Sequence, residues 1–135
     1  MTLKYLLDTN TLIHAVRYKP ENLRLAFNEH AGRMALSTVV LSELVYGAEA
    51  SANVEANLRV VEGLAARLVL LDFDASAAHH TAQIRAELKR AGTRIGPYDA
   101  MIAGHARSRG LVVVTNNLRE FERVPGLQLE DWVAS

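Results

Sequence analysis

Three acidic residues of this 135-residue chain stand alone in apolar segments. Asp8 follows a short apolar run, Glu43 is the only charged residue in 36–47, and Asp99 is the only charged residue in 96–103. A carboxylate in apolar surroundings is costly to desolvate unless a positive or hydrogen-bonding group compensates it. If the three lay close together they would also repel one another, and a divalent cation would relieve both penalties. Because oxygen ligands suit hard cations, Mg²⁺ is the expected ion, with Mn²⁺ as the alternative.

Each of these acids also has an ordinary structural explanation. Asp8 could cap the helix that follows it, and Glu43 could lie on the exposed face of an amphipathic helix. Asp99 lies near the predicted start of a helix, where the helix dipole favours an acid. A fourth polar residue, Asn117, is by itself more often a turn residue than a ligand. The combination, rather than any one residue, favours a metal site.

The elements that would position these residues alternate between strands and helices. The expected strands are 4–7, 34–36, 68–71, 111–114 and an edge strand at 127–129. The expected helices are 11–18 with Thr9 or Asn10 as N-cap, 20–30, 37 or 38 to about 50, 53–66, 74–91 and 97–109, with a short segment near 119–122. This order predicts a three-layer α/β fold, in which helices flank a central, mainly parallel sheet with right-handed crossovers.

The whole chain, residues 1–135, is predicted to be a single domain, because no linker or repeat divides it. In parallel sheets, sites form beyond the carboxyl ends of the strands. Asp8 follows the first predicted strand, and Asn116 and Asn117 follow the strand that ends near Thr115. We therefore expect this edge of the sheet to carry the chemistry.

The composition narrows the class of protein. Fifteen basic residues balance fifteen acidic ones, so a partner of high charge would have to be bound by a local patch. The absence of cysteine excludes disulfides and thiolate metal sites. No apolar run reaches the roughly 18 residues of a membrane span, and the first residues lack a signal-peptide pattern. We therefore expect a cytoplasmic protein with no membrane partner.

Four segments occur in the order found in one family of enzymes. The chain resembles PIN-domain ribonucleases, and within them the VapC subgroup, the toxin halves of bacterial toxin–antitoxin pairs. The resemblance runs almost end to end and includes the tail segments 119–127 and 130–132. The four segments that carry it are Tyr5-Leu6-Leu7-Asp8-Thr9-Asn10, Leu41-Ser42-Glu43-Leu44-Val45-Tyr46-Gly47-Ala48, Gly96-Pro97-Tyr98-Asp99-Ala100-Met101-Ile102-Ala103-Gly104-His105-Ala106 and Val114-Thr115-Asn116-Asn117.

The resemblance implies a PIN-like fold and a role for each matched residue. It makes Asp8, Glu43 and Asp99 catalytic metal ligands of a Mg²⁺-dependent endoribonuclease. Asn117 stands where PIN domains often have Asp, so this catalytic position carries less charge here, and tight binding of a second metal ion is in doubt. Two supporting residues are implied nearby, namely Thr115, which would orient the site through its hydroxyl, and Glu120, which could add a carboxylate. Cleavage by an activated water would leave 5′-phosphate and 3′-hydroxyl ends.

The resemblance also implies partners. The substrate would be RNA, with tRNA and in particular the anticodon loop of the initiator tRNA as the expected target. The toxin would be a homodimer, neutralised by a cognate VapB-type antitoxin in a larger toxin–antitoxin complex. Operator DNA would be contacted only through the antitoxin.

Basic residues near the proposed ligands supply the required local patch. The RNA-binding candidates are Arg85, Lys89, Arg90, Arg94, Arg107 and Arg119, with Arg109 and Arg123 close in sequence. A solvated helix face is the alternative explanation for some of them. Aromatic residues that could stack on bases are scarce, and Tyr98 and Phe121 are the expected ones.

Three alternatives remain open at this stage. A haloacid-dehalogenase-type phosphatase also begins with a strand ending in Asp. Such an enzyme needs a second Asp two residues later, where this chain has Asn10, and a downstream lysine, whereas no lysine follows Lys89 in this chain. A PIN-like protein that binds RNA without cutting it is favoured by Asn117 and by the zero net charge. A metal-free histidine mechanism is disfavoured, because neighbouring His79 and His80 would point about 100° apart on a helix. His105 lies six residues after Asp99 and is not on the same helical face, and His14 and His30 have no evident partner.

Overall fold

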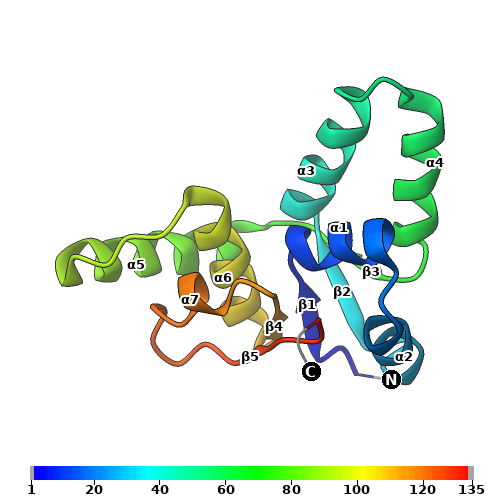
Figure 1. Ribbon diagram of the computed structural model, residues 1–135. Helices are drawn as coiled ribbons and strands as arrows, with labels where there is room; N and C mark the ends of the chain where they lie inside the picture. Colours follow the sequence, from blue (N-terminus) through cyan, green and yellow to red (C-terminus); the bar gives the residue numbers. More distant parts are fainter. Residues whose placement is uncertain (1, 134–135) are drawn as a thin grey trace.

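The computed structural model describes residues 2–133. Its centre is a five-stranded sheet in the order β3-β2-β1-β4-β5, and every neighbouring pair of strands is parallel. The strands are β1 (Tyr5–Leu7), β2 (Met34–Ser37), β3 (Val69–Leu71), β4 (Val112–Val114) and β5 (Leu129–Glu130). The predicted α/β class with a parallel sheet flanked by helices is confirmed, and the sheet is fully rather than mainly parallel (Figure 1).

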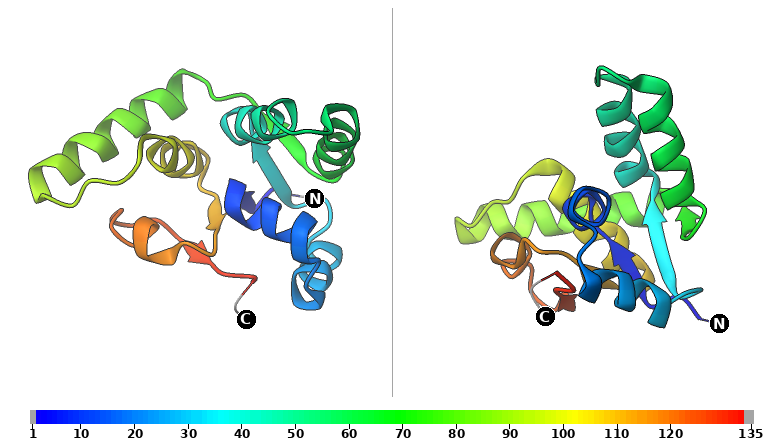
Figure 2. Two further views of the ribbon diagram at one scale, coloured as in Figure 1. Left: turned by 45° about the horizontal axis from the view of Figure 1, so that its top comes forward. Right: turned by 45° about the vertical axis from the view of Figure 1, so that its right-hand side comes forward.

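Seven helices connect the strands within the described residues. They are α1 (Thr9–Tyr18), α2 (Glu21–Glu29), α3 (Thr38–Glu49), α4 (Val54–Ala65), α5 (Ala75–Ala91), α6 (Pro97–Arg109) and α7 (Leu118–Phe121). The α3–α4 pair rises on one side of the sheet, while α5, α6 and α7 gather on the other (Figures 1 and 2). Within residues 2–133, none of the helices is long and apolar enough to cross a membrane.

The core lies on the three inner strands. Every residue of β1, β2 and β4 is buried, whereas the edge strand β3 exposes Val69 and Leu70. Inner strands of a parallel sheet are covered on both faces, which explains why their sequences are apolar without alternation. The sheet therefore holds its inner carboxyl ends in fixed relative positions.

Local signals determine where the helices begin and end. Ser37 and Asp74 act as N-caps through their side chains, and Gly92 and Gly110 end α5 and α6 with φ values of 73° and 65°. The predicted N-cap of the first helix is wrong, because the carboxylate of Asp8 accepts the Thr11 N–H and caps α1 itself. The last strand also begins two residues later than expected.

The helices α5 and α6 pack against each other without space for a side chain at one position. A Cβ atom on Gly104 would lie 2.1 Å from Thr81 Oγ1 and 2.7 Å from the Thr81 backbone. Glycine is therefore required at residue 104 for this helix pair to approach so closely. The contact fixes α6, which carries Asp99.

Candidate active site

Asp8 is the most deeply buried acid of the site. It is only 2% exposed, and its Oδ1 accepts the Thr11 N–H at 2.8 Å. Its Oδ2 accepts a short hydrogen bond from the hydroxyl of Thr115, and its backbone N–H donates to the Val114 carbonyl at 3.0 Å. Burial raises the pKa of Asp8, while the hydrogen bonds from Thr115 and Thr11 oppose that rise. The carboxylate is thus held in one orientation at the carboxyl end of β1.

Thr115 connects Asp8 to Asn117. While its hydroxyl donates to Asp8, the same oxygen accepts the Asn117 N–H at 2.9 Å. Asn117 is the N-cap residue of α7, but its side chain makes no capping hydrogen bond. The structure therefore places both residues beside Asp8, as the order of β1 and β4 in the sheet requires.

Glu43 reaches the site from α3. Its Oε1 accepts a hydrogen bond of 2.9 Å from the hydroxyl of Thr9, the first residue of α1. Because Thr9 follows Asp8 directly, this bond brings the carboxylate of Glu43 to the same end of β1. Sequence reasoning identified Thr9 only as a helix cap, and its role as a partner of Glu43 needs the folded structure to be seen.

Asp99 completes the set of expected acids. It lies in the first turn of α6, and its pKa is raised to about 6. The largest cause is burial, followed by the negative charges of Glu120, Asp8 and Glu43. Mutual repulsion of this kind requires the four carboxylates to lie near one another. We refer to Asp8, Glu43, Asp99 and Glu120 as the acidic centre.

Glu120 enters the acidic centre from α7. Its Oε1 accepts the Gly96 N–H at 3.0 Å, immediately before α6 begins. A Cβ atom on Gly96 would lie 3.9 Å from Asp99 Oδ2 and 4.0 Å from Glu120 Oε1, so both carboxylates face this glycine. Glu120 thus holds the start of the helix that carries Asp99.

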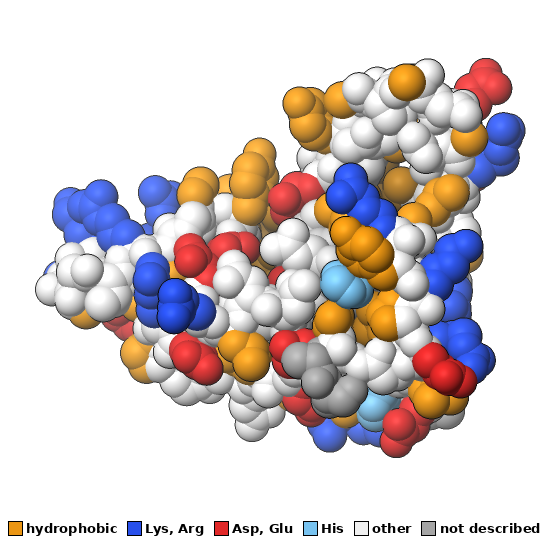
Figure 3. Space-filling model, in the orientation of Figure 1, with side chains coloured by type: hydrophobic (Ala, Val, Ile, Leu, Met, Phe, Trp, Pro, Cys, Tyr) orange, Lys and Arg blue, Asp and Glu red, His pale blue; other side chains and the backbone are white. Residues whose placement is uncertain are grey.

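The acidic centre has the donor chemistry of a divalent-cation site. Among residues 2–133, none of its four carboxylates forms an ion pair with Lys or Arg. In that same range, no three acidic or histidine side chains lie in an arrangement that could already hold a metal ion. An open set of oxygen donors suits Mg²⁺, which keeps several of its waters when bound by proteins. The donor chemistry of these residues, rather than a preformed arrangement, therefore fits such an ion; acidic side chains are visible on this face of the molecule (Figure 3).

Sequence reasoning missed one further acid near this centre. Asp131 follows β5, and its negative charge contributes to the raised pKa of Asp8. The Thr115 N–H donates to the Glu130 carbonyl at 3.0 Å, which fixes the end of β5 beside β4. The signal that identified Asp8, an acid directly after a strand, was also available for Asp131.

The basic candidates fall into different environments. Arg85, Lys89 and Arg94 line a common groove beside α6. Arg107 instead turns to α5, where it donates to His80 Nδ1 at 2.9 Å and to Gln83 Oε1 at 2.8 Å. The remaining two candidates, Arg90 and Arg119, are exposed.

The aromatic candidates are also separated by burial. Phe121 is completely buried, so the prediction that it stacks on bases is wrong. The prediction failed because α7 is too short for a periodic sequence pattern to show which of its side chains points inward. Tyr98, beside Asp99, is 55% exposed. Sequence reasoning missed Tyr46, which lies one turn after Glu43 and is 72% exposed.

The histidines are engaged in packing. His105 is buried, its Nδ1 lies 2.9 Å from Ser37 Oγ, and burial lowers its pKa. His80 accepts the Arg107 bond described above, and His30 stacks on Trp132. These contacts support the expectation that His30, His80 and His105 are structural.

A parallel α/β sheet with an acidic centre at its carboxyl end is the architecture of PIN-type nuclease domains. In agreement, the family model described as the PIN domain matches residues 5–127 of the chain. The chain belongs to the PIN-domain family, and within it to the VapC ribonucleases. The family match removes the phosphatase alternative.

The relatives on which this placement rests are similar over nearly their whole length. The chain is 62% identical to the tRNA(fMet)-specific endonuclease VapC of Salmonella typhimurium, over 96% of the chain and 98% of the relative. It is 47% identical to ribonuclease VapC2 of Haemophilus influenzae, over 97% and 99%. The DNA-bound VapBC structure from Salmonella typhimurium contains a chain with a TM-score of 0.94 and 62% identity, covering 96% of this chain and 98% of that one.

A second solved structure agrees at lower identity. The VapBC2 complex from Rickettsia felis, bound to a promoter DNA fragment, matches with a TM-score of 0.91 at 35% identity, over 98% of this chain and 99% of that one. The fold is thus shared with toxin–antitoxin complexes of different bacteria.

Proposed function

We propose that this protein is a metal-dependent endoribonuclease that hydrolyses phosphodiester bonds in RNA. The observation that carries the proposal is the acidic centre, which has no basic partner within residues 2–133 and in which burial, followed by the charges of the three other carboxylates, raises the pKa of Asp99 to about 6. Such an arrangement is costly in the metal-free protein and favourable around a divalent cation. The ribonuclease names of the relatives support the same activity.

The residues of the acidic centre would divide the work. Asp8, Glu43 and Asp99 would hold Mg²⁺, with Mn²⁺ as the alternative. When bound, the ion would polarise the scissile phosphate and lower the pKa of a water molecule. Asn117 would offer an amide oxygen as the fourth catalytic position, and Glu120 and Thr115 would support the ligands.

The chain's own contribution is to fix these ligands before RNA arrives. Thr11 and Thr115 hold both oxygens of Asp8, and Thr9 holds Glu43. Because His30, His80 and His105 have other partners, none of these three imidazoles is assigned as general base. Water attack would leave 5′-phosphate and 3′-hydroxyl ends.

The similarity to VapC proteins supports proposals for substrate and partners. The Salmonella relative is named for tRNA(fMet), so the initiator tRNA is the proposed substrate, with its anticodon loop as the site of cleavage. We further propose a homodimer that a VapB-type antitoxin neutralises in a larger complex, with operator DNA bound through the antitoxin. The proposed setting is the cytoplasm, and residues 1–135 are proposed to act as one PIN domain.

Basic side chains around the acidic centre would bind the RNA phosphates. This role is proposed for Arg85, Lys89, Arg90, Arg94, Arg107 and Arg119. Phosphate contacts of this kind set the register of an RNA without reading its sequence. Of the six, Arg107 already bonds to α5, so its share in RNA binding is expected to be small.

A cleavage assay tests the proposed function. The purified, antitoxin-free protein is incubated with total tRNA, with Mg²⁺ or with chelator, beside the variant Asp8→Ala. We expect discrete cuts that need both the metal and Asp8 and that leave 5′-phosphate ends. If the folded protein with Mg²⁺ or Mn²⁺ cuts neither tRNA nor other cellular RNA, the nuclease proposal fails and the non-cutting binder replaces it.

A further inference from the structure

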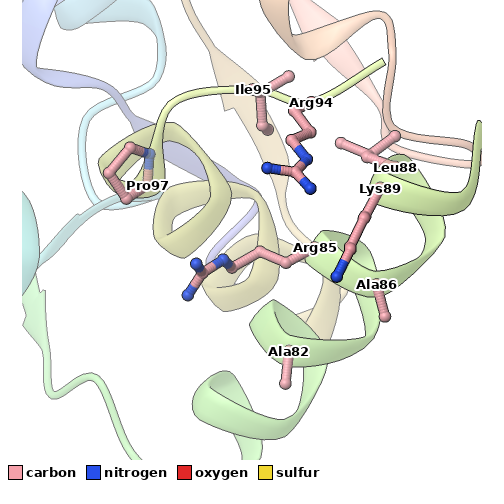
Figure 4. Close-up of a pocket in the computed structure, with 8 residues that line it drawn as sticks. All are labelled: Ala82, Arg85, Ala86, Leu88, Lys89, Arg94, Ile95 and Pro97. Atoms are coloured by element: carbon pink, nitrogen blue, oxygen red, sulfur yellow. The ribbon is translucent and has the colours of Figure 1, made fainter. Parts of the chain in front are cut away.

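A basic groove lies between α5 and the segment that leads into α6. It has a volume of about 530 Å³, and its lining includes the cationic Arg85, Lys89 and Arg94 together with the apolar Ala82, Ile95 and Pro97. Figure 4 shows Arg85 and Lys89 projecting from α5 and Arg94 entering from the connecting segment, so cations from two elements share one opening.

The three cations of the basic groove are not neutralised by the protein. Glu87 is the only acid in residues 75–98, and its nearest cation is Arg107, at 4.0 Å. Within residues 2–133, the side chains of Arg85, Lys89 and Arg94 form no ion pair. Because Glu87 pairs with Arg107, the three cations of the groove have no ion-pair partner within residues 2–133. The groove is therefore a local positive region in a chain whose net charge is zero.

The basic groove and the acidic centre share a wall. Ile95 and Pro97 line the groove, while the N–H of Gly96 between them donates to Glu120 Oε1 at 3.0 Å, and a Cβ atom on Gly96 would lie 3.9 Å from Asp99 Oδ2. Positive and negative regions are therefore separated by about one residue of backbone. The space-filling view likewise shows basic side chains near the α5 end of the face that carries acidic side chains (Figure 3).

We propose that the basic groove binds the RNA backbone next to the scissile phosphate, on one side of the cut. This inference rests on the proposed function, and it adds the location at which the RNA backbone is bound. A strand crossing Gly96 would place one phosphate at the acidic centre and its neighbours among Arg85, Lys89 and Arg94. The apolar residues of the lining, Ala82, Ile95 and Pro97, could contact a ribose or the edge of a base. A free inorganic anion has no such apolar part. The groove would therefore favour long RNA over short fragments.

A comparison of variants on long and short substrates tests this inference. The variants are Arg85→Gln, Lys89→Gln, Arg94→Gln and their combination, with Arg59→Gln on the distant, exposed face of α4 as a matched control. With tRNA as substrate, we expect KM to rise about tenfold or more in the triple variant and kcat to change less than about threefold, because phosphate contacts mainly contribute binding. Cleavage of a dinucleotide, which is too short to fill the groove, should fall far less than cleavage of tRNA, and the Arg59→Gln control should match the parent protein on both substrates.

A binding measurement separates this inference from the proposed function. In an Asp8→Ala background, the affinity for a labelled single-stranded RNA is measured at several salt concentrations. Loss of three phosphate contacts should reduce the salt slope by about 2, since each contact contributes about 0.7 for single strands. If the triple variant keeps the salt slope and the KM of the parent protein, the proposed RNA-binding role of the groove is wrong, even if the parent protein cleaves RNA.

Three further outcomes are decisive. A fall in kcat without a rise in KM would overturn the inference, because the cations would then act on the acidic centre. Loss of self-association by the triple variant, with unchanged RNA affinity, would instead assign the groove to a contact between copies. If the parent protein binds RNA through the groove but never cleaves it, the RNA-binding role of the groove is supported and the proposed nuclease function fails.

Discussion

The two helix pairs that supply the acids differ in how firmly they are held. In the α5–α6 pair, residues 102–106 of α6 are all buried, and Gly104 lies directly against Thr81. In the α3–α4 pair, α3 buries three residues and no residue of α4 is buried. Asp99 therefore stands on a helix fixed by close packing, whereas Glu43 stands on a pair that projects from the sheet (Figure 1). The acidic centre spans a firmly packed and a loosely packed region.

One buried hydrogen bond joins the two regions, and a part-buried one joins α3 to α1. His105 of α6 bonds to Ser37, the N-cap of α3, and Thr9 bonds to Glu43. The position of Glu43 relative to Asp99 thus depends on these polar contacts as well as on the packing of Val40 and Leu44 in the core. Regions with few buried contacts are the ones that open most easily. We therefore expect the α3–α4 side to adjust when RNA or a partner binds.

The largest expected effect comes from removing one acid from each pair. Asp99→Asn and Glu43→Gln should each lower RNA cleavage by more than about 100-fold, since loss of a partner behind a metal ligand alone commonly costs 10- to 100-fold. Initial cleavage rates with saturating Mg²⁺ check this. Should Glu43→Gln retain nearly full activity, the projecting pair would not supply a ligand.

The packing difference itself is tested by two glycine substitutions. Gly104→Ala forces a methyl group into Thr81 and should lower the free energy of unfolding by about 1–3 kcal/mol or more. Gly47→Ala on α3 meets no atom within 4 Å and should raise it by about 0.5–1 kcal/mol. Chemical denaturation of both variants measures the contrast. Equal destabilisation would show that the two pairs are packed alike.

A smaller effect is expected from the tether of Glu43. Thr9→Val removes the hydroxyl that donates to Glu43, and Thr9→Ser keeps it. We expect cleavage to fall about tenfold in the first variant and to stay near the parent rate in the second, because an orienting partner is lost but the ligand remains. The apparent affinity for Mn²⁺ should weaken in parallel. A similar loss in both variants would point to packing of the methyl group instead.

The smallest effect concerns proton binding by Asp99. Its pKa is 3.8 in an unperturbed chain and about 6 in the folded protein, so the folded state binds more protons between these values. The stability of the metal-free protein should therefore fall as the pH rises from about 4 to 6, and Mg²⁺ should stabilise it more at pH 7 than at pH 5. Thermal unfolding across this range, with and without Mg²⁺, measures both trends.

Removing neighbouring charges sharpens the same point. Glu120→Gln should lower the pKa of Asp99 more than Glu43→Gln does, because the charge of Glu120 contributes more to its rise. Titration of the Asp99 carboxyl by NMR in the metal-free protein measures the order. The reverse order would place Glu43 closer to Asp99 than Glu120 is.

Much of the fold could be predicted because its signals are local. Apolar strands, the cap at Ser37 and the stops at Gly92 and Gly110 depend on residues close in sequence. Asp8, Glu43 and Asp99 were recognisable because a lone charge in an apolar segment needs a reason to be there.

What could not be predicted depends on contacts between distant segments. The bond from Thr115 to Asp8 joins residues 107 positions apart and exists only because β4 lies next to β1. The burial of Phe121 and the turn of Arg107 toward α5 likewise follow from packing that no local pattern encodes. Residue type indicated which chemistry was available, and the order of the strands determined which side chains meet.

The central place of β1 also controls when the acidic centre can form during synthesis. β1 is synthesised first, yet it pairs with β4. The pairing of Tyr5 with Val112 and the hydrogen bond from Thr115 to Asp8 therefore cannot form until β4 has been synthesised. Contacts so distant in sequence form late, because the whole intervening chain must be ordered first. A growing chain that already contains Asp8, Glu43 and Asp99 therefore holds every proposed ligand but no assembled site. We therefore expect the proposed nuclease activity to arise only once the chain is nearly complete.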